Sequence, residues 1–414
     1  MHRALAALGL TRLPHACVQV VGTNGKGSTA TLLAALCSAH GLGVGLSTSP
    51  HFLSVRERIR LYRGGMPGDP GTPGAPLRDG LLSEADWLDA ARECLAATAG
   101  FGPSGQLTYF ELLTVMAAWL FAARGADVAV YEAGLGGSHD ATTALPRDMA
   151  VFTPMGMDHA GVLGPTIGHI ARDKAGAISE GGLAVTSGQP PEAMDALADR
   201  ARQARAELVP AREAARFDAT SGTVRFPAEG LEVAGAALGM PGSFQAENAA
   251  TALAAFSVLA GRMGLPVSGE AVRRALAATR IAGRMQRLAP TWMRGELLLD
   301  CAHNVPAMQT LEAALAAGGI RPSAMVFTCL ADKDFAGMSE IVTRLSTGPI
   351  LVPGLSCPGR TRDPADVART LGPRAEAFPD AAAALGRCRD LAGTILVCGS
   401  MYLLSEVLGL ADAP

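Results

Sequence analysis

The stretch VVGTNGKGST, residues 20–29, limits the possible folds more than any other part of the chain. It overlaps an apolar run, Cys17–Val21, that is typical of a buried strand, and a helical pattern follows from Ser28 to His40. When a strand is followed by a glycine-rich turn and then a helix, the amides of the turn and the positive end of the helix dipole point to one place. An anion bound there is stabilised. The stretch therefore predicts a phosphate site in an α/β domain.

This loop departs from the common phosphate-loop pattern, G-x-x-x-x-G-K-[ST], at two positions. Val20 occupies the place of the first glycine, and Gly27 separates Lys26 from Ser28. The spacing alone therefore leaves open whether the loop holds a triphosphate, and the rest of the chain must decide which reaction it serves.

Length and charge narrow the class of protein. A chain of 414 residues predicts two domains, each with its own core. The net charge of −3 argues against a nucleic-acid or anionic-membrane partner, so small-molecule partners are expected. There is no run of about 18 apolar residues and no small-residue cleavage site near the N-terminus, which indicates a cytoplasmic protein. A monomer is expected.

The cysteines and lysines carry different information. The eight cysteines are scattered and form no C-x-x-C pair, so we expect buried, reduced thiols rather than a zinc site or a disulfide framework. Only three of the 35 basic residues are lysines: Lys26, Lys174 and Lys333. A compact ammonium can sit among phosphate oxygens, and an amine can also lose its proton and react, which an always-protonated guanidinium cannot do. Biased composition alone can also leave a few lysines behind.

Apolar runs alternate with helical patterns along the whole chain. DVAVYEAG, DMAVFTP and LAVTSG are strand-like and are separated by helical segments such as residues 110–124, which predicts a mainly parallel sheet. A run rich in proline and glycine, residues 64–80, predicts a surface loop. From about residue 286 the pattern restarts with ELLLDCAHN, AMVFTCL, GPILVPG and TILVCGSM. We therefore predict domains over residues 1–285 and 286–414.

Three strand ends in the first domain carry polar residues that could complete the phosphate site. Parallel α/β sheets bind ligands at the carboxyl ends of their strands. Glu132 follows one strand directly, as a magnesium ligand would need to, although a solvated acid is the alternative. Asp158 and His159 follow another strand, where the histidine is either a ligand or a structural residue. Ser49 offers a neutral oxygen, but a Ser-Pro pair also commonly begins a turn.

Lys174 lies in PTIGHIARDKAGAI, on the same helical stripe as Ile167, Ile170 and Ile178. An inward-facing lysine is costly unless it is paired, neutral or modified, and the simple alternative is that its amine extends to the surface. Carbon dioxide bound to the amine as a carbamate would make a carboxylate-like group that could orient magnesium. That chemistry would explain why arginine does not replace this lysine.

The remaining candidates are polar residues at the ends of strands in the second domain and near the boundary between the domains. Each is nonspecific alone, and a structural role is the alternative for each. They are Asn248, Arg284, Asp300, His303, Ser400 and Tyr402.

Eight motifs occur in one order along nearly the whole chain. They are GTNGKGST, STSPHF followed by RERI, LTYFELLT, YEAGLGGSHDATT, MDHAGVLGPTIGHIARDKAGAI, GRMQ, LDCAHN and CGSMYL. On these motifs the chain resembles the folylpolyglutamate synthase/dihydrofolate synthase family of the Mur ligase superfamily. In that family GTNGKGS is the usual phosphate loop, with the inserted glycine.

The resemblance implies a Mur-ligase-like α/β fold, with a phosphate-loop domain built on a mainly parallel sheet and a Rossmann-like C-terminal domain. It implies ATP and Mg²⁺ as cofactors, with a carbamylated Lys174 and with Lys26 and His159 also catalytic. It implies ATP contacts from Asn24, Gly25, Lys26, Gly27, Ser28, Asn248, Arg284 and Asp300, with His303, Ser400 and Tyr402 nearby. Magnesium ligands would be Ser49, Glu132 and His159, and acceptor contacts Thr108, Tyr109, Phe110, Glu111 and Asp140.

The implied reaction joins L-glutamate to dihydropteroate, to reduced folates, or to both. The acceptor carboxylate attacks the γ-phosphoryl group of ATP to give an acyl phosphate, and the amine of glutamate then displaces phosphate. Family members usually read GGRLDATN after the catalytic glutamate, whereas Ser138, His139 and Thr143 stand here for the arginine, leucine and asparagine. These departures leave open a Mur-type ligase with another carboxylate acceptor. A nucleotide-binding protein without catalysis is a separate alternative, against which the matched magnesium ligands and Lys174 argue.

Overall fold

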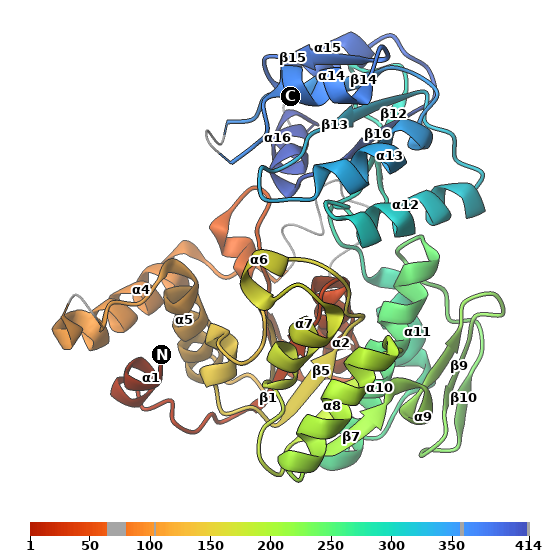
Figure 1. Ribbon diagram of the computed structural model, residues 1–414. Coiled ribbons are helices and arrows are strands. Elements are labelled where there is room, and N and C mark those ends of the chain that lie inside the picture. Colours follow the sequence, from red (N-terminus) through yellow and green to blue (C-terminus); the bar gives the residue numbers. More distant parts are fainter. Residues whose placement is uncertain (64–79, 103–104, 357–359, 412–414) are drawn as a thin grey trace. The chain divides into compact units, whose positions relative to one another are not determined.

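The computed structural model describes residues 1–63, 80–102, 105–356 and 360–411 (Figure 1). The described chain forms two compact units. Unit 1 comprises Met1–His51, Val55–Gly239 and Gln245–Arg280, and unit 2 comprises Phe52–Ser54, Met240–Phe244 and Ile281–Pro414. The sequence-based boundary at residues 285 and 286 stays a prediction. Apart from Gly80, the surface loop expected over residues 64–80 lies outside the described residues.

Unit 1 is built on a seven-stranded sheet with the order β3-β2-β4-β1-β5-β6-β7. Only the edge strand β3 runs antiparallel to its neighbour, so the prediction of a mainly parallel sheet is confirmed. The central strands are largely apolar and buried on both faces, as parallel strands covered by helices must be. The strands are β1 (Ala16–Val21), β2 (Gly43–Ser47), β3 (Ile59–Arg63), β4 (Val128–Glu132), β5 (Met149–Phe152), β6 (Leu183–Thr186) and β7 (Glu207–Pro210).

Two apolar clusters cover one face of this sheet. One joins Cys17 and Tyr131 to helices α4 and α5, and the other joins Val21 and Phe152 to α7 and α8. The helix α2 contacts β1, β2 and β4 and also packs against α11. The helices of unit 1 are α1 (His2–Ala7), α2 (Lys26–Ala39), α4 (Glu84–Thr98), α5 (Tyr109–Ala123), α6 (Ala160–Leu163), α7 (Ile167–Ala175), α8 (Pro191–Gln203), α9 (Ala211–Ala214) and α11 (Gly269–Ala278), and the long helix α10 (Ser243–Met263) begins in unit 2.

Unit 1 also contains a small antiparallel sheet that the sequence patterns do not predict. Its strands are β8 (Arg216–Asp218), β9 (Thr223–Phe226) and β10 (Leu231–Val233), and they pair in the order β10-β9-β8. Each strand has only three or four residues, which is too short for a clear alternation of apolar and polar positions.

Unit 2 is a second α/β layer with the strand order β11-β12-β16-β13-β14-β15, in which only β11 is antiparallel. The four strands expected from the sequence are β12, β13, β14 and β16, and short edge strands extend the sheet at both sides. The strands are β11 (Gln286–Leu288), β12 (Glu296–Leu299), β13 (Ala324–Phe327), β14 (Ile350–Pro353), β15 (Ala375–Phe378) and β16 (Thr394–Cys398). The helices are α12 (Val305–Ala317), α13 (Phe335–Leu345), α14 (Pro364–Leu371), α15 (Ala381–Cys388) and α16 (Met401–Ala411).

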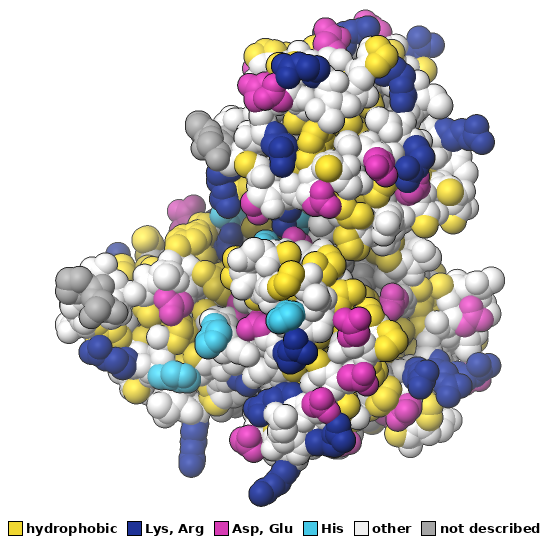
Figure 2. All heavy atoms as spheres, in the orientation of Figure 1, with side chains coloured by type: hydrophobic (Ala, Val, Ile, Leu, Met, Phe, Trp, Pro, Cys, Tyr) yellow, Lys and Arg dark blue, Asp and Glu magenta, His cyan; other side chains and the backbone are white. Residues whose placement is uncertain are grey.

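The surface and the thiols agree with the expectations from composition. Basic and acidic side chains are interspersed over the face drawn in Figure 2, in keeping with the small net charge. The cysteines in the described part of the chain are buried free thiols, and Cys357 lies outside that part. Within the same part, no helix has both the length and the apolar character needed to cross a membrane.

Candidate functional site

The predicted phosphate loop connects β1 to α2 in unit 1. The helix begins at Lys26, and Gly25 caps it in the left-handed region with φ of +85°. A Cβ atom on Gly25 would lie 2.2 Å from Asn248 Oδ1, so glycine is required by both backbone and space. The amide of Asn248 donates to Gln245 Oε1 over 3.1 Å. The first turn of α2 therefore begins beside a fixed side-chain amide.

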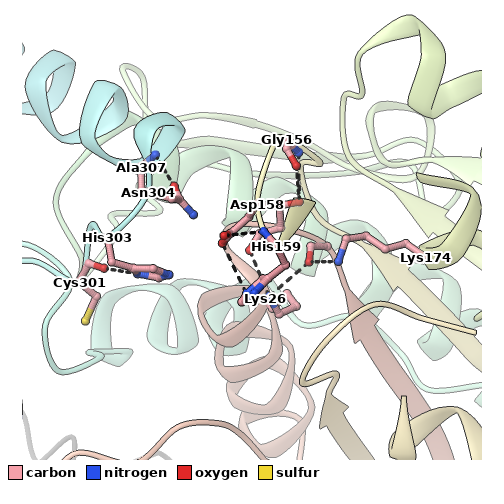
Figure 3. A network of polar contacts seen from close by, with 11 residues as sticks. Lys26, Gly156, Asp158, His159, Lys174, Cys301, His303, Asn304 and Ala307 are labelled. Carbon is pink, nitrogen blue, oxygen red and sulfur yellow. Dashed lines mark hydrogen bonds and ion pairs between the residues drawn. The ribbon is translucent and has the colours of Figure 1, made fainter. Parts of the chain in front are cut away.

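Two lysines converge on one carbonyl of this loop (Figure 3). Lys174 Nζ donates to Gly22 O over 2.8 Å, and Lys26 Nζ approaches the same oxygen at 3.3 Å and Thr23 O at 3.1 Å. Lys174 comes from α7, far away in sequence, whereas Lys26 belongs to the loop itself. The structure thus brings together two of the three residues predicted to be catalytic.

Lys174 is buried, with 4% of its surface exposed, as the apolar stripe of its helix predicts. The alternative of an amine extended to the surface is wrong. Burial and, to a smaller extent, the positive charge of Lys26 lower the pKa of Lys174 to about 7, although Asp173, Asp158 and Asp140 partly oppose the shift. A buried amine with this pKa is largely neutral at physiological pH and can react as a nucleophile.

Glu132 and Ser49, two predicted magnesium ligands, lie together at the ends of β4 and β2. Ser49 N donates to Glu132 Oε2 over 2.9 Å. A Cβ atom on Gly27 would lie 3.3 Å from both carboxylate oxygens, so the glycine inserted in the loop leaves space for Glu132 beside the start of α2. The departure from the common phosphate loop at Gly27 thereby has a physical reason.

These oxygen donors fit a hard divalent cation. Among the residues that the structure describes, no three His, Cys, Asp or Glu side chains gather into a metal cluster. Magnesium, however, usually takes only one or two carboxylates from the protein, with waters and phosphate oxygens completing its shell. Glu132 with its neighbour Ser49 would be such a partial set, placed next to a phosphate loop.

His159, the third predicted magnesium ligand, caps α6 beyond the end of β5. Its φ of +52° lies in the left-handed region, which is rare for a residue other than glycine. Asp158 Oδ1 accepts from His159 N over 2.9 Å. The hydroxyl of Thr23 exchanges hydrogen bonds of 3.1 Å with the backbone of Gly156, so the segment leading to His159 is fastened to the phosphate loop (Figure 3).

Two of the five predicted acceptor residues, Phe110 and Asp140, come together at Gly134. A Cβ atom there would lie 2.9 Å from the ring of Phe110 and 3.3 Å from Asp140 Oδ2. Thr108 and Glu111 form a capping box at the start of α5, with Thr108 N donating to Glu111 Oε2 over 2.8 Å, so their polar groups are already used locally. Tyr109 is 58% exposed. Their roles toward an acceptor stay predictions.

Unit 2 gathers its own predicted residues around the end of β12. Asp300 is buried and accepts from Met285 N over 3.1 Å and from Ala302 N over 2.9 Å. Burial raises the pKa of Asp300, and the charge of Arg284 opposes that shift. His303 lies just beyond, with Nδ1 in contact with Cys301 O at 2.7 Å.

Ser400 and Tyr402, the two candidate residues nearest the C-terminus, follow β16 in unit 2. Ser400 is fully buried and accepts from Tyr402 N over 3.2 Å at the start of α16. Tyr402 contacts Arg360, whose guanidinium carbon also lies 5.2 Å from the centre of the tyrosine ring. Two candidates that followed the same strand in sequence are therefore neighbours in the fold.

Sequence reasoning missed several polar residues that hold these groups in place. Gln245 is fully buried and orients Asn248. Gln189 at the end of β6 accepts from Met155 N over 3.1 Å and donates to Thr153 O over 3.0 Å, which fixes the backbone at the end of β5. A glutamine carries no distinctive motif, and only Gln189 has a signal that could have indicated such a role, which is its position after the end of a strand.

Known proteins are similar to this chain over nearly its whole length. The model of the Mur ligase, glutamate ligase domain matches residues 283–401. The folylpolyglutamate synthase of Lacticaseibacillus casei is 31% identical over 417 residues, which cover 97% of this chain and 91% of the relative. The dihydrofolate synthase/folylpolyglutamate synthase of Escherichia coli K12 is 30% identical over 414 residues, with 99% and 89% covered.

This chain belongs to the folylpolyglutamate synthase/dihydrofolate synthase family. A solved structure from Yersinia pestis, described as a bifunctional enzyme of this family complexed with AMPPNP and Mn ion, superposes with a TM-score of 0.83 at 30% identity, covering 100% of this chain and 92% of that one. The Mur-ligase-like fold predicted for this folylpolyglutamate synthase/dihydrofolate synthase family member is therefore confirmed.

Proposed function

We propose that this chain is an ATP-dependent ligase that adds L-glutamate to dihydropteroate, to folates, or to both, with a divalent metal as cofactor. Membership of the family supports this function. The convergence of Lys26, Lys174 and Glu132 on one phosphate loop is the observation that carries it. Such a loop with a carboxylate and two amines suits a reaction in which negative charge builds on transferred phosphate oxygens.

The chain's own residues account for the chemistry in two steps. The amides at the start of α2 and the amine of Lys26 hold the phosphates of ATP while the acceptor carboxylate attacks the γ-phosphorus and ADP leaves. The amine of L-glutamate then attacks the resulting acyl phosphate, loses a proton, and releases inorganic phosphate. Ser49, Glu132 and His159 are the residues that would hold Mg²⁺, which when bound neutralises charge on the phosphate oxygens. Positioning carries most of the rate, so the protein needs no nucleophile for the transfer itself.

Lys174 has a separate role in this proposal. Its buried, largely neutral amine is suited to form a carbamate with carbon dioxide, whose negative charge would take the place of a carboxylate beside the loop. The action of the chain as a monomer in the cytoplasm is also part of the proposal.

The assay that tests this function measures phosphate release from ATP with L-glutamate and an acceptor, either dihydropteroate or tetrahydrofolate. Release should require glutamate and acceptor together. Comparison of the two acceptors also decides which activity is present. Release in the absence of both, or no release with any pairing, would contradict the proposal, and the second outcome would favour either the Mur-type ligase with another acceptor or the nucleotide-binding protein without catalysis.

A further inference from the structure

Gln19 is a polar residue inside the central strand β1, and 1% of its surface is exposed. It alternates with Cys17 and Val21, so it faces the side of the sheet on which one apolar cluster contacts α5 and the other contacts α7. Its carbonyl oxygen has no hydrogen-bond partner among the described residues. An unpaired buried carbonyl opposes folding, so the amide group of this side chain must provide something in return.

The amide of Gln19 can have only one orientation. Its nitrogen donates to Thr142 Oγ1 and to Thr143 Oγ1, each over 2.7 Å. Both threonine protons are already committed, because Thr142 donates to Asp140 Oδ1 over 2.5 Å and Thr143 donates to Gly137 O over 2.6 Å. The two hydroxyls can therefore only accept from Gln19, and the rotated amide would place its oxygen against two oxygens.

Through these threonines, Gln19 holds a loop that follows Glu132, which we name the 133–143 loop. Asp140 shapes its first half, since Oδ2 accepts from Gly134 N and Leu135 N, each over 2.9 Å. Its other oxygen accepts from the backbone of Thr142 over 2.9 Å. Asp140, expected from the resemblance to contact the acceptor, thus has its carboxylate engaged by four hydrogen bonds within the loop.

The far side of the 133–143 loop is fastened to α7. Gly137 N donates to Asp173 Oδ2 over 2.8 Å, and Ser138 donates from both N and Oγ to Asp173 O over 2.9 Å. The two backbones are in close contact, because a Cβ atom on Gly137 would lie 2.5 Å from Lys174 Cα. Lys174, the residue next to Asp173, donates to the phosphate loop at Gly22 O. A continuous set of contacts therefore runs from β1 through the loop to Lys174.

We infer that Gln19, Thr143 and Ser138 are positioning residues that act through the 133–143 loop to hold Lys174 against the phosphate loop. Ser138 and Thr143 stand where the family usually has arginine and asparagine, and in this chain both are engaged in these contacts. The departures from the family pattern, which left another carboxylate acceptor open, therefore have a second explanation that makes different kinetic predictions.

The inference rests on the proposed role of Lys174, and kinetics separate the two explanations. Thr143→Val keeps the shape but removes both hydrogen bonds of the hydroxyl. We expect kcat to fall by about 10- to 100-fold, the range for misplacement of a catalytic group by a remote change. KM for ATP and for the acceptor should change by less than about threefold, because no substrate contact is lost. Thr143→Ser, which retains the hydroxyl, should restore kcat to within about threefold of the original.

A matched control variant separates a failure of the inference from a general folding defect. A second measurement, hydrogen exchange, separates it from a failure of the proposed function. Thr98→Val removes a similarly half-buried hydroxyl that bonds within α4, and it should leave kcat unchanged. Hydrogen exchange followed by mass spectrometry should show faster exchange in residues 170–178 of Thr143→Val but not of Thr98→Val. Gln19→Glu, which places an oxygen against the two hydroxyls, should produce the same local change.

The outcomes divide clearly. A raised KM for the acceptor with unchanged kcat in Thr143→Val would show that the loop contacts substrate, and it would overturn the inference. Unaltered exchange over residues 170–178 in both Thr143→Val and Gln19→Glu would overturn it as well. If the original protein ligates no acceptor, the proposed function fails, while hydrogen exchange still decides whether the loop holds the helix of Lys174.

Discussion

Replacing Lys174 with arginine tests whether a neutral amine is what the site requires. The ordinary lysine pKa of 10.5 falls to about 7 in this environment. At pH 7.5 roughly three-quarters of such amines are neutral, compared with about one in a thousand at the ordinary pKa. The fold thus raises the reactive fraction by nearly three orders of magnitude. Arginine stays protonated and cannot form the carbamate, so Lys174→Arg should lose activity by about 100-fold or more.

The carbamate also predicts the direction in which the rate of the original enzyme changes with pH. Because only the neutral amine captures carbon dioxide, the carbamate should be lost as pH falls through about 7, and the rate should fall with it. The assay follows phosphate release between pH 6 and 8.5, in buffers either freed of carbon dioxide or supplied with bicarbonate. Bicarbonate should raise the rate most on the acidic side, where the carbamate is least populated. Arg172→Lys, an exposed exchange of one basic group for another on the same helix, is the matched control and should retain activity.

One further variant, Lys174→Ala, completes the test. Lys174→Ala should be inactive, and small carboxylates such as formate or acetate should restore part of its activity by occupying the place of the carbamate. Full activity of Lys174→Arg would refute the carbamate, because a guanidinium can supply only positive charge. The carbamate would also be refuted if the rate were independent of carbon dioxide at every pH and small carboxylates did not rescue Lys174→Ala.

Two other predictions concern the loop and the core. Gly25→Ala should weaken ADP binding by at least about tenfold in calorimetry, because the new Cβ would meet Asn248 at 2.2 Å. The matched control is Gly41→Ala, at the other end of the same helix, where φ is similar and the space is open. This control should cost about 1 kcal/mol of stability and leave binding intact. Burial lowers the pKa of His15 below 6.5, so the free energy of unfolding should fall as pH drops below 6.5, and His15→Gln should reduce that fall in denaturant titrations; an equal fall in both proteins would contradict this role.

Much of the fold was predictable because its signals are local. The apolar strands, the glycine loop and the helix of Lys174 each occupy a short segment with a clear period. The parallel sheet follows from their alternation. The short strands of residues 216–233 carried no such signal, since three or four residues cannot display a period, and the antiparallel edges β3 and β11 depend on pairing rather than on pattern.

The candidate site was predictable only in part, for a related reason. Placement at strand ends correctly brought Glu132 beside Ser49 and the loop, because a parallel sheet collects those ends at one edge. The burial of Lys174 followed from helical spacing. Its perturbed pKa also depends on Lys26, which lies 148 residues earlier in the chain. No local sequence pattern indicates that two residues so far apart come together in space. Buried glutamines were missed because their function lies entirely in what they hydrogen-bond.

The two lysines together explain why this loop has its unusual form. A positive charge at Lys26 is needed for phosphate, yet the same charge makes a protonated Lys174 costly, because both amines lie on Gly22 O. The site therefore favours a neutral Lys174 before any ligand binds. Conversion of that amine to an anion would turn repulsion between the two residues into attraction. Gly27, which leaves room for Glu132 beside Lys26, adds a carboxylate to the same loop. The departure at residue 27 is thus the geometric condition for placing opposite charges close to one phosphate site.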